Sequence, residues 1–342
     1  MMRFSGINKF LLGSATVIGG AIAVRSMVRA VKKYNLRDKV VLITGGSRGL
    51  GLVMARQLVD LGAKVVVCAR DEEELVRSAE ELSVRTQHYL AVPCDITDPK
   101  QVQQLIEETE SIMGPVDVLI NNAGIIQVGP METLSDQDYE QAMKVHFWGP
   151  YYLMKAVIPG MKQRKNGRIV NIVSIGDKVS FPHLLPYNAS KYALSGLSEG
   201  LTAELRRSGI KVTTIYPGLM RTGSPRNIDV KGRHEEEYAW FKISDSLPVI
   251  SMNAERASKQ IINAMRHGER TRTLSFTAKL AKAVHGIAPD LTISAFEAIN
   301  SLLPGPEGGS KEKRKGYESD SAISSSSLTE KTKKAEVRNN EL

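Results

Sequence analysis

Apolar and polar positions follow two alternating periods along residues 40–303. Apolar runs of strand length are separated by longer stretches in which apolar residues recur every three or four positions, as on one face of a helix. We predict six strands from these runs: Val40–Ile43, Lys64–Cys68, Tyr89–Val92, Val116–Ile120, Arg168–Val173 and Lys211–Ile215. Because strands that alternate with helices are typical of βαβ units, the pattern predicts an α/β fold with a parallel sheet and helices on both faces.

The start of the chain has a different pattern. Residues 10–24 contain no charged side chain, the apolar stretch resumes at residues 27–28, and basic residues flank it at Arg25, Arg29, Lys32 and Lys33. The segment is shorter than the roughly 20 residues that span a bilayer, but its basic flank favours the cytoplasmic side. We therefore expect residues 1–37 to be a membrane anchor, with everything after it in the cytoplasm. A leader that packs on the surface of a cytoplasmic protein, or a segment that lies in the membrane interface, is the alternative.

The end of the chain lacks both periods. Residues 304–342 are rich in Ser, Lys and Glu and have few large apolar side chains, so we expect a disordered tail. The remaining residues, 38–303, then form one domain. Within it, residues 277–303 are an amphipathic extension that packs on a membrane, on the body of the protein or on a partner subunit.

Charge and composition exclude several classes of protein. The 342 residues carry a net charge of +9, of which residues 1–40 account for +7 and residues 304–342 for +1. Since no basic surface is left for the folded part, we expect no nucleic-acid partner. The two cysteines, Cys68 and Cys94, lie in or beside apolar runs and form no disulfide framework. The histidines show no zinc-ligand spacing, so we expect no metal site.

A glycine-rich turn follows the first strand. Its sequence TGGSRGLG, residues 44–51, precedes a helical pattern, and glycines at such a junction let a phosphate approach amides at the positive end of the helix. The spacing differs from the G-x-G-x-x-G fingerprint, so a merely structural turn is the alternative. The candidate cofactor ligands of this turn are Gly45, Ser47, Arg48, Gly49, Leu50 and Gly51.

The second strand bears on the choice of cofactor. A strand of an NAD-binding unit ends in Asp or Glu, which binds the ribose, whereas an arginine accommodates the 2′-phosphate of NADP. This chain has Arg70 at that point and Arg48 in the glycine turn. We therefore expect NADP(H) to be preferred over NAD(H). Alternatively, Arg70 pairs with Asp71, or Asp71 itself binds the ribose.

Two further strand ends supply candidate cofactor ligands. After the fourth strand stands NNAG, whose Asn122, Ala123 and Gly124 would lie at the ligand-binding edge of the sheet or form an ordinary turn. Asp95 follows the third strand. We expect it to bind the adenine or to cap the helix that begins near Asp98.

The pattern Tyr187-x-x-x-Lys191 is the strongest chemical signal. Residues four apart share one face of a helix, so an ammonium would lie beside the phenol and lower its pKa, making Tyr187 a candidate general acid and base. Ser174, at the end of the strand Arg168–Val173, could hold a substrate carbonyl. A solvated helix face is the alternative for a lone pattern of this kind.

The order TGGSRGLG, NNAG, Ser174, YNASK and Pro217-Gly218 resembles the classical short-chain dehydrogenase/reductases over about residues 38–270. The resemblance implies a doubly wound Rossmann-type sheet of seven strands, NAD(P)-dependent hydride transfer to or from a carbonyl or alcohol, and a homo-oligomer.

The resemblance also implies roles for single residues. Tyr187 would donate the proton, Lys191 would orient the nicotinamide ribose, and Ser174 would polarise the substrate oxygen. Around the cofactor, the glycines of the turn would hold the pyrophosphate, Asn121 would steady the sheet, and the nicotinamide end would meet Pro217, Gly218 and Thr222.

One position departs from the family pattern. Where the family usually has an asparagine that holds a water in the proton path, this chain has His146 in VHFWG. We expect His146 either to hold that water and to titrate near neutrality, or to be a satisfied core histidine.

The substrate is expected to bind between two variable segments. Residues 219–251 form a lid that contains Tyr238, Trp240 and Phe241, unless they pack as an ordinary amphipathic helix, and the opposite wall comes from Phe181, His183, Leu184 and Leu185. We therefore predict a membrane-associated, NADPH-dependent reductase of a ketone or aldehyde, compatible with a hydrophobic, lipid-like substrate. The alternative is a protein of the same fold that binds the cofactor as a sensor or scaffold with little turnover.

Overall fold

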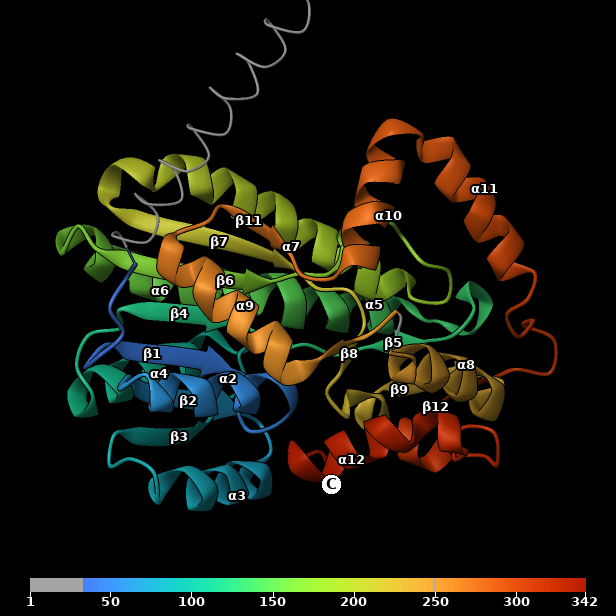
Figure 1. Ribbon diagram of the computed structural model, residues 1–342, viewed down its shortest axis with the longest axis horizontal. Helices are drawn as coiled ribbons and strands as arrows, with labels where there is room; N and C mark the ends of the chain where they lie inside the picture. Colours follow the sequence, from blue (N-terminus) through green and yellow to red (C-terminus); the bar gives the residue numbers. More distant parts are fainter. Residues whose placement is uncertain (1–32, 249) are drawn as a thin grey trace, which may run out of the picture. The chain divides into compact units, whose positions relative to one another are not determined.

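The computed structural model describes residues 33–248 and 250–342 (Figure 1). The chain divides into two compact units, Met1–Asn35 and Leu36–Leu342, and the second holds the fold. The expected anchor, residues 10–28, lies outside the described residues. Among the helices that are described, none combines the length and the apolar character needed to cross a membrane.

A parallel sheet forms the centre of the second unit. Its seven strands in the described part of the chain have the order β11-β7-β6-β4-β1-β2-β3, and every pair is parallel. The strand order reverses at β1, which pairs with β2 on one side and β4 on the other. The strands are β1 (Val40–Thr44), β2 (Lys64–Ala69), β3 (Tyr89–Pro93), β4 (Val118–Asn121), β6 (Gly167–Ile172), β7 (Ile210–Tyr216) and β11 (Thr271–Thr273). This confirms the predicted doubly wound α/β fold.

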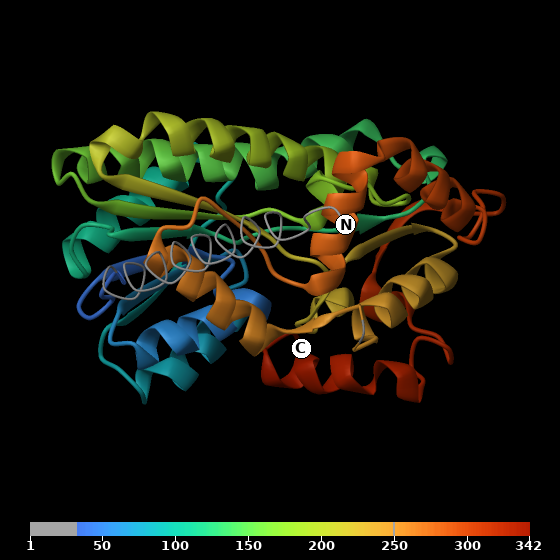
Figure 2. The same cartoon turned by 45° about the horizontal axis from the view of Figure 1, so that its top comes forward.

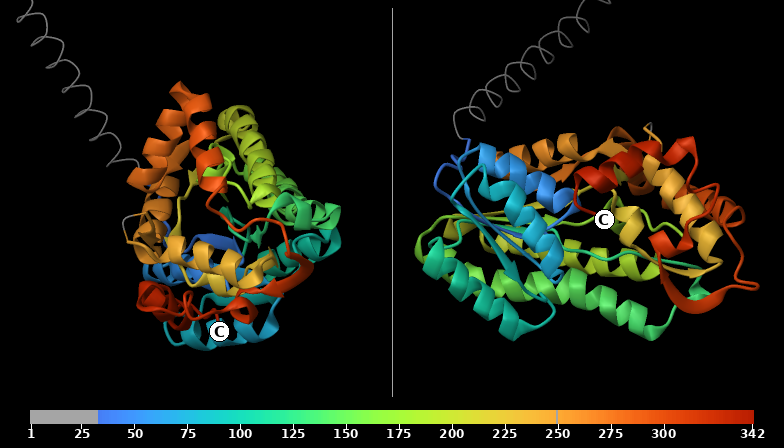
Figure 3. Two further views of the ribbon diagram at one scale, coloured as in Figure 1. Left: turned by 90° about the vertical axis from the view of Figure 1, so that its right-hand side faces the viewer. Right: turned by 90° about the horizontal axis from the view of Figure 1, so that it is seen from below.

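Helices cover both faces of the sheet (Figure 3). One layer contains α2 (Gly49–Asp60), α3 (Glu72–Ser83) and α9 (Ala254–His267); the other contains α4 (Pro99–Ile112), α6 (Gly149–Gln163) and α7 (Leu185–Glu204). The main hydrophobic core lies between the second layer and the strands, and includes the fully buried Leu42, Leu119 and Ile169. Because both faces are covered, the central strands are continuous apolar runs, which is why the sequence pattern located them.

Smaller elements surround the carboxyl edge of the sheet. Residues 219–251, expected as a lid, contain helix α8 (His234–Ser246), whose Tyr238 and Phe241 are buried in a second apolar cluster. The remaining elements are α5 (Asp136–Met143), the π-helical turn η2 (Lys144–Trp148), α10 (Phe276–Ile287), α11 (Pro289–Asn300), β8 (Met220–Arg221) and β10 (Met252–Asn253), with short 3₁₀ turns η1 (Met131–Thr133), η3 (Ile175–Asp177), η4 (Arg206–Ser208), η5 (Ser224–Asn227), η6 (Gly316–Ser319) and η7 (Ser327–Thr329).

Residues 304–342 differ from the disordered tail that the sequence predicted. They form strand β12 (Ser310–Lys315), antiparallel to β9 (Asp229–Gly232), which also pairs with β5 (Gln127–Val128). Helix α12 (Glu330–Arg338) lies beside α8, and the end of the chain lies next to the start of α2 (Figure 2). The composition misled the prediction because polar contacts hold this segment, such as the 2.6 Å contact between the hydroxyls of Thr332 and Ser246.

Candidate active site

Strand β6 delivers Ser174 to the carboxyl edge of the sheet. The strand ends at Ile172, and Ser174 caps the short turn η3 by accepting a hydrogen bond from the amide of Gly176 at 3.0 Å. Gly176 is required here, since a Cβ at that position would lie 2.5 Å from the side-chain oxygen of Asn188. The cap fixes the position of the hydroxyl, which remains partly exposed.

Helix α7 presents Tyr187 and Lys191 one turn apart, as predicted. Lys191 is 4% exposed, and its ammonium donates to the carbonyl of Ile172 at 2.9 Å and lies 5.7 Å from the centre of the Tyr187 ring. This helix face is therefore buried against the end of β6 and is not a solvated surface. The structure brings Ser174, Tyr187 and Lys191 to one place.

The protonation of these groups differs from the sequence expectation. Burial raises the pKa of Tyr187, and the hydrogen bond with Ser174 opposes this change. Burial lowers the pKa of Lys191 to about 8, and the carboxylate of Asp177 opposes it. The expected lowering of the Tyr187 pKa by Lys191 is absent because desolvation of the phenol dominates. At neutral pH Tyr187 is consequently a protonated phenol, the form that a proton donor needs.

His146 sits in the π-helical turn η2, fully buried beside Tyr187, with the two rings edge to face at 5.4 Å. Its Nε2 accepts from the amide of Ile125 at 3.1 Å, and its Nδ1 lies 2.7 Å from the hydroxyl of Ser190. Since that hydroxyl also donates to the carbonyl of Pro186 at 2.8 Å, the imidazole must donate through Nδ1.

These contacts decide between the two expectations for His146. Both ring nitrogens are engaged by protein atoms, so neither is left to hold a water. Burial and the nearby Lys191 lower its pKa well below 6.5, which contradicts the expected titration near neutrality. The side chain fits the satisfied core histidine, although its partners are an amide and a hydroxyl where a backbone carbonyl was expected.

Asp177 is a site residue that the sequence analysis missed. It lies three residues after Ser174, is fully buried, and neither carboxylate oxygen has a hydrogen-bond partner among the described residues. Burial raises its pKa to about 6, while Ser195 and the nearby lysines oppose this effect. Its position in the segment between Ser174 and Tyr187 was the available signal.

The glycine turn and the NNAG motif are joined directly. The hydroxyl of Thr44, which ends β1, accepts from the amides of Asn122 and Ala123, both at 3.0 Å, and the Asn122 amide group donates to the carbonyls of Thr44 and Gly45. NNAG is thus part of the site's frame and more than an ordinary turn. Asn121 donates to Asn171 of β6 at 2.7 Å, which links two neighbouring strands.

The turn has the shape of a dinucleotide cradle. Gly45 has a φ of +60°, and a Cβ there would lie 2.9 Å from the Cα of Ala123. A Cβ at Gly51 would lie 2.0 Å from the carbonyl oxygen of Gly45. The turn is followed at once by the amino end of α2, where backbone amides and the helix dipole favour a phosphate. These residues fit a pyrophosphate.

The two arginines have different surroundings. Arg48 contacts the buried carboxylate of Glu74, which also accepts from the Ser47 hydroxyl at 2.8 Å. Arg70 lies exposed just after β2. Asp71 caps α3 by accepting from the Glu74 amide at 2.9 Å. The alternative, an Arg70–Asp71 ion pair, is not found among the described residues, and Asp71 uses a carboxylate oxygen to cap α3.

The remaining predicted cofactor ligands lie on surrounding loops. Asp95 accepts from the amide of Thr97 at 2.9 Å, while Asp98 is the residue that caps α4. After Pro217 and Gly218, the buried Thr222 contacts the Ser224 hydroxyl at 2.7 Å.

Aromatic side chains of α8 and α11 pack around Phe181, which precedes Tyr187 by six residues in the chain. Phe181 stacks on Trp240 of α8 at 5.8 Å and meets Phe296 of α11 edge to face at 5.3 Å. His183 and Glu237 are both buried, and Nδ1 of His183 lies 2.9 Å from the Glu237 carboxylate. The same carboxylate accepts a hydrogen bond from the Trp240 indole at 2.7 Å. Helix α8 and the segment before Tyr187 thus pack on one another. In the described chain, no group of three or more His, Cys, Asp or Glu side chains is arranged to hold a metal ion.

A model of the family described as short chain dehydrogenase matches residues 39–231, more than half of the chain. The chain belongs to the short chain dehydrogenase family. Its similarity extends over most of a putative ketoacyl reductase of granaticin polyketide synthase from Streptomyces violaceoruber, with 31% identity over 77% of this chain and 92% of that protein. A fatty acyl-CoA reductase from Acinetobacter baylyi is 32% identical over 81% and 89%.

Other short chain dehydrogenases match over different lengths. Dehydrogenase/reductase SDR family member 7B of Mus musculus is 38% identical over 58% of this chain and 62% of its own length. Among solved structures, a gluconate 5-dehydrogenase from Burkholderia cenocepacia, in complex with NADP and tartrate, aligns with a TM-score of 0.64 and 27% identity over 73% of this chain and 99% of that chain. These matches confirm the Rossmann fold and an oxidoreductase family.

Proposed function

We propose that this short chain dehydrogenase reduces a ketone or aldehyde with NADPH and that Tyr187 donates the proton. The gathering of Tyr187, Lys191 and Ser174 at the carboxyl end of β6 carries this proposal. Burial raises the pKa of Tyr187, so the phenol carries its proton at neutral pH, which is the form a proton donor needs.

The cofactor proposal rests on the glycine turn and on Arg70. The amide of Gly49 and the amino end of α2 would hold the pyrophosphate, and the exposed guanidinium of Arg70 would meet the 2′-phosphate. NADPH held in this way supplies a hydride. The gluconate 5-dehydrogenase solved with NADP supports this choice of cofactor by similarity.

The protein's own groups complete the reaction. The Ser174 hydroxyl donates to the carbonyl oxygen of the substrate and polarises it. As the carbonyl carbon gains the hydride and its C–O double bond becomes single, Tyr187 transfers its phenolic proton to the oxygen, which yields the alcohol and leaves a phenolate. The Lys191 ammonium, near the same ring, stabilises that phenolate until solvent returns the proton.

The substrate class is proposed from the aromatic side chains around Phe181. Phe181, six residues before Tyr187 in the chain, packs with Trp240 and Phe296, and such ring surface would suit an apolar chain attached to the reacting carbonyl. The similar fatty acyl-CoA reductase supports a long-chain carbonyl compound as substrate.

We also propose that residues 10–28 attach the protein to the membrane with the catalytic unit on the cytoplasmic side. The test compares membrane and soluble fractions for the full chain and a chain without residues 1–32, which keeps the buried Leu36. A full chain found only in the soluble fraction would refute attachment.

We further propose a homo-oligomer. Trp148 is exposed and makes ring contacts with side chains of α6, which supports this proposal. Light scattering of the purified protein tests it.

The main experiment follows NADPH consumption with a panel of ketolipids, long-chain aldehydes and short ketones. We expect turnover with the apolar carbonyls, and loss of turnover in Tyr187→Phe, which retains the ring but not the hydroxyl. Tyr192→Phe, on an exposed part of the same helix, is the matched control. Turnover retained in Tyr187→Phe would refute the proposed proton donor.

A further inference from the structure

The end of the chain contacts the residues that are proposed to bind the nucleotide. The amide of Gly49, at the start of α2, donates to the carbonyl of Asn339 at 2.9 Å. The guanidinium Nε of Arg48 lies 3.3 Å from the carboxylate of Glu341. A carbonyl and a carboxylate thus lie at the place where the amino end of a helix favours a phosphate.

The contacts extend from the glycine turn to Thr222, another proposed cofactor ligand. Asn340 donates to the carbonyl of Ser47 at 2.9 Å, and Asn339 donates to the carbonyl of Thr222, beyond β7, at 2.9 Å. Asn339 and Glu341 are 0% and 2% exposed, so they fill the space between the glycine turn and the lid.

The local sequence explains how the chain enters this site. Helix α12 ends in Asn339 and Asn340, and Asn340 has a φ of +58°, a left-handed conformation that asparagine tolerates better than most residues. The amide of Glu341 donates back to the carbonyl of Glu336 at 3.0 Å, which closes a Schellman turn. This turn directs residues 339–341 toward α2.

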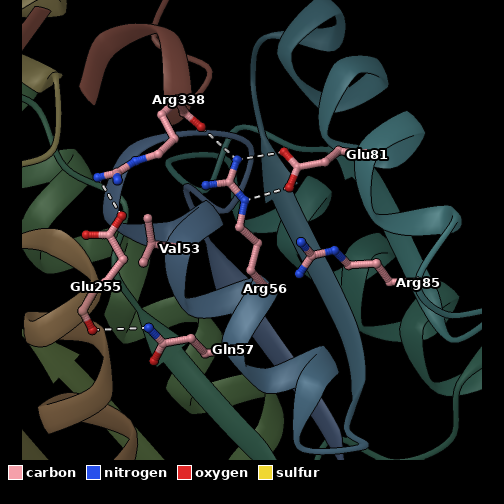
Figure 4. A pocket seen from close by; sticks show the side chains of 7 residues that line it. All are labelled: Val53, Arg56, Gln57, Glu81, Arg85, Glu255 and Arg338. Carbon is pink, nitrogen blue, oxygen red and sulfur yellow. Dashed lines mark hydrogen bonds and ion pairs between the residues drawn. The ribbon is translucent and has the colours of Figure 1, made fainter. Parts of the chain in front are cut away.

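Side chains outside the nucleotide site hold the end of α12 in place. Arg56 of α2 binds Glu81 and donates to the carbonyl of Arg338 at 2.8 Å, and Arg338 reaches Glu255 of α9 at 2.5 Å. These residues line a pocket of about 370 Å³ beside α2 (Figure 4). Arg338 of α12 lines this pocket together with residues of α2 and α9, so the pocket is part of the surface on which α12 docks.

From these contacts we infer that residues 339–341 are an internal competitor of the nucleotide, so that binding of NADPH requires this segment to leave the cleft. This inference rests on the proposed function, because it takes the glycine turn to be the nucleotide site. The amide hydrogen of Gly49 and the guanidinium of Arg48 cannot bind residues 339–341 and a nucleotide phosphate fully at the same time. The segment therefore lowers the apparent affinity for the nucleotide until something displaces it.

The test uses the full chain and two readouts. Hydrogen exchange of residues 330–342 is measured with and without saturating NADPH, and the Kd of NADPH is measured for the unchanged chain and for Asn340→Ala. This substitution removes the contacts with Ser47 and with the carbonyl of Glu74, and it disfavours the left-handed turn. Val337→Ala, on the exposed face of α12, is the matched control, and Glu341→Arg is a second disrupting variant that places like charge beside Arg48.

We expect NADPH to accelerate exchange in residues 339–342, and both disrupting variants to bind NADPH at least fivefold more tightly than the control. NADPH binding that leaves these amides protected, or equal Kd values in all variants, would overturn the inference and leave the proposed function intact. Failure of every variant to bind NADPH or NADH would refute the proposed function, and the inference with it.

Discussion

The imidazole Nδ1 of His146 lies 2.7 Å from the hydroxyl oxygen of Ser190, in the interior of the protein beside the Tyr187 ring. This contact, together with the amide of Ile125 at Nε2, fixes one neutral tautomer of the histidine. We therefore expect His146 to act on the site by packing and positioning.

The buried histidine makes stability depend on pH. Its pKa in the folded protein is well below 6.5, near which it titrates in the unfolded chain. The unfolded state then binds more protons, so the free energy of unfolding should fall below pH 6.5 by about 1.4 kcal/mol per pH unit from this group. Urea unfolding at pH 7.5 and 5.5 should show a smaller loss in His146→Asn than in the unchanged protein. Equal losses would show that His146 keeps its usual pKa.

The ammonium of Lys191 should limit activity at alkaline pH. Its pKa of about 8 means that the charge near Tyr187 is lost above that pH, so we expect kcat/KM to fall there. Asp177→Asn should move this limb to lower pH, because the Asp177 carboxylate raises the pKa of Lys191. Asp290→Asn, on the exposed helix α11, serves as the control. A pH profile that is unchanged by Asp177→Asn would contradict this assignment.

Arg70 should determine the preference for NADPH. Arg48 is already engaged by Glu74, whereas Arg70 is exposed at the end of β2. A charge-assisted hydrogen bond is worth about 1.5–3 kcal/mol, so Arg70→Ala should weaken NADPH binding roughly tenfold or more and leave NADH binding nearly unchanged. Titration of both nucleotides against Arg70→Ala and the surface control Arg207→Ala, in the turn η4, measures this. Equal weakening of the two nucleotides would exclude a 2′-phosphate contact.

The docked segment should respond to pH through Glu341. Burial raises the pKa of the Glu341 carboxyl to about 7. Arg48 and Asn227 lower this pKa, whereas the neighbouring carboxylates of Glu74 and Glu336 raise it further. A raised carboxyl pKa means that docking is strongest at low pH and weakens as pH rises from about 4.5 to about 7. The affinity of the unchanged chain for NADPH should therefore improve roughly tenfold between pH 5.5 and 7, relative to Glu341→Gln. If the affinity for NADPH changed equally with pH in the unchanged chain and in Glu341→Gln, titration of Glu341 would not be coupled to docking.

The sequence predicted the parts of the fold that depend on apolar patterning. Strands such as Val40–Thr44 are buried on both faces, so a continuous apolar run is their necessary signature. The edge strand β11, Thr271–Thr273, was missed because its three residues are polar or partly exposed and carry no such run.

The catalytic candidates were predictable because their spacing is set by a helix and a strand end. What the sequence did not reveal is how desolvation acts on them, since burial raises the pKa of Tyr187 despite the nearby Lys191. Nor did it reveal the docking of residues 339–341, which depends on backbone carbonyls and a left-handed asparagine. The pair Asn339-Asn340 after a helical pattern was the available signal for that turn.

Transfer of deuterium from NADPH labelled at C4 of the nicotinamide tests the central claim most directly. Mass spectrometry of the alcohol formed from a long-chain aldehyde or ketone should show one deuterium on the former carbonyl carbon with the unchanged protein and with Tyr192→Phe. Tyr187→Phe should bind the labelled NADPH with a similar Kd and form no labelled alcohol. Labelled alcohol from Tyr187→Phe at an undiminished rate, or no label from the unchanged protein with any carbonyl compound of the panel, would contradict this account.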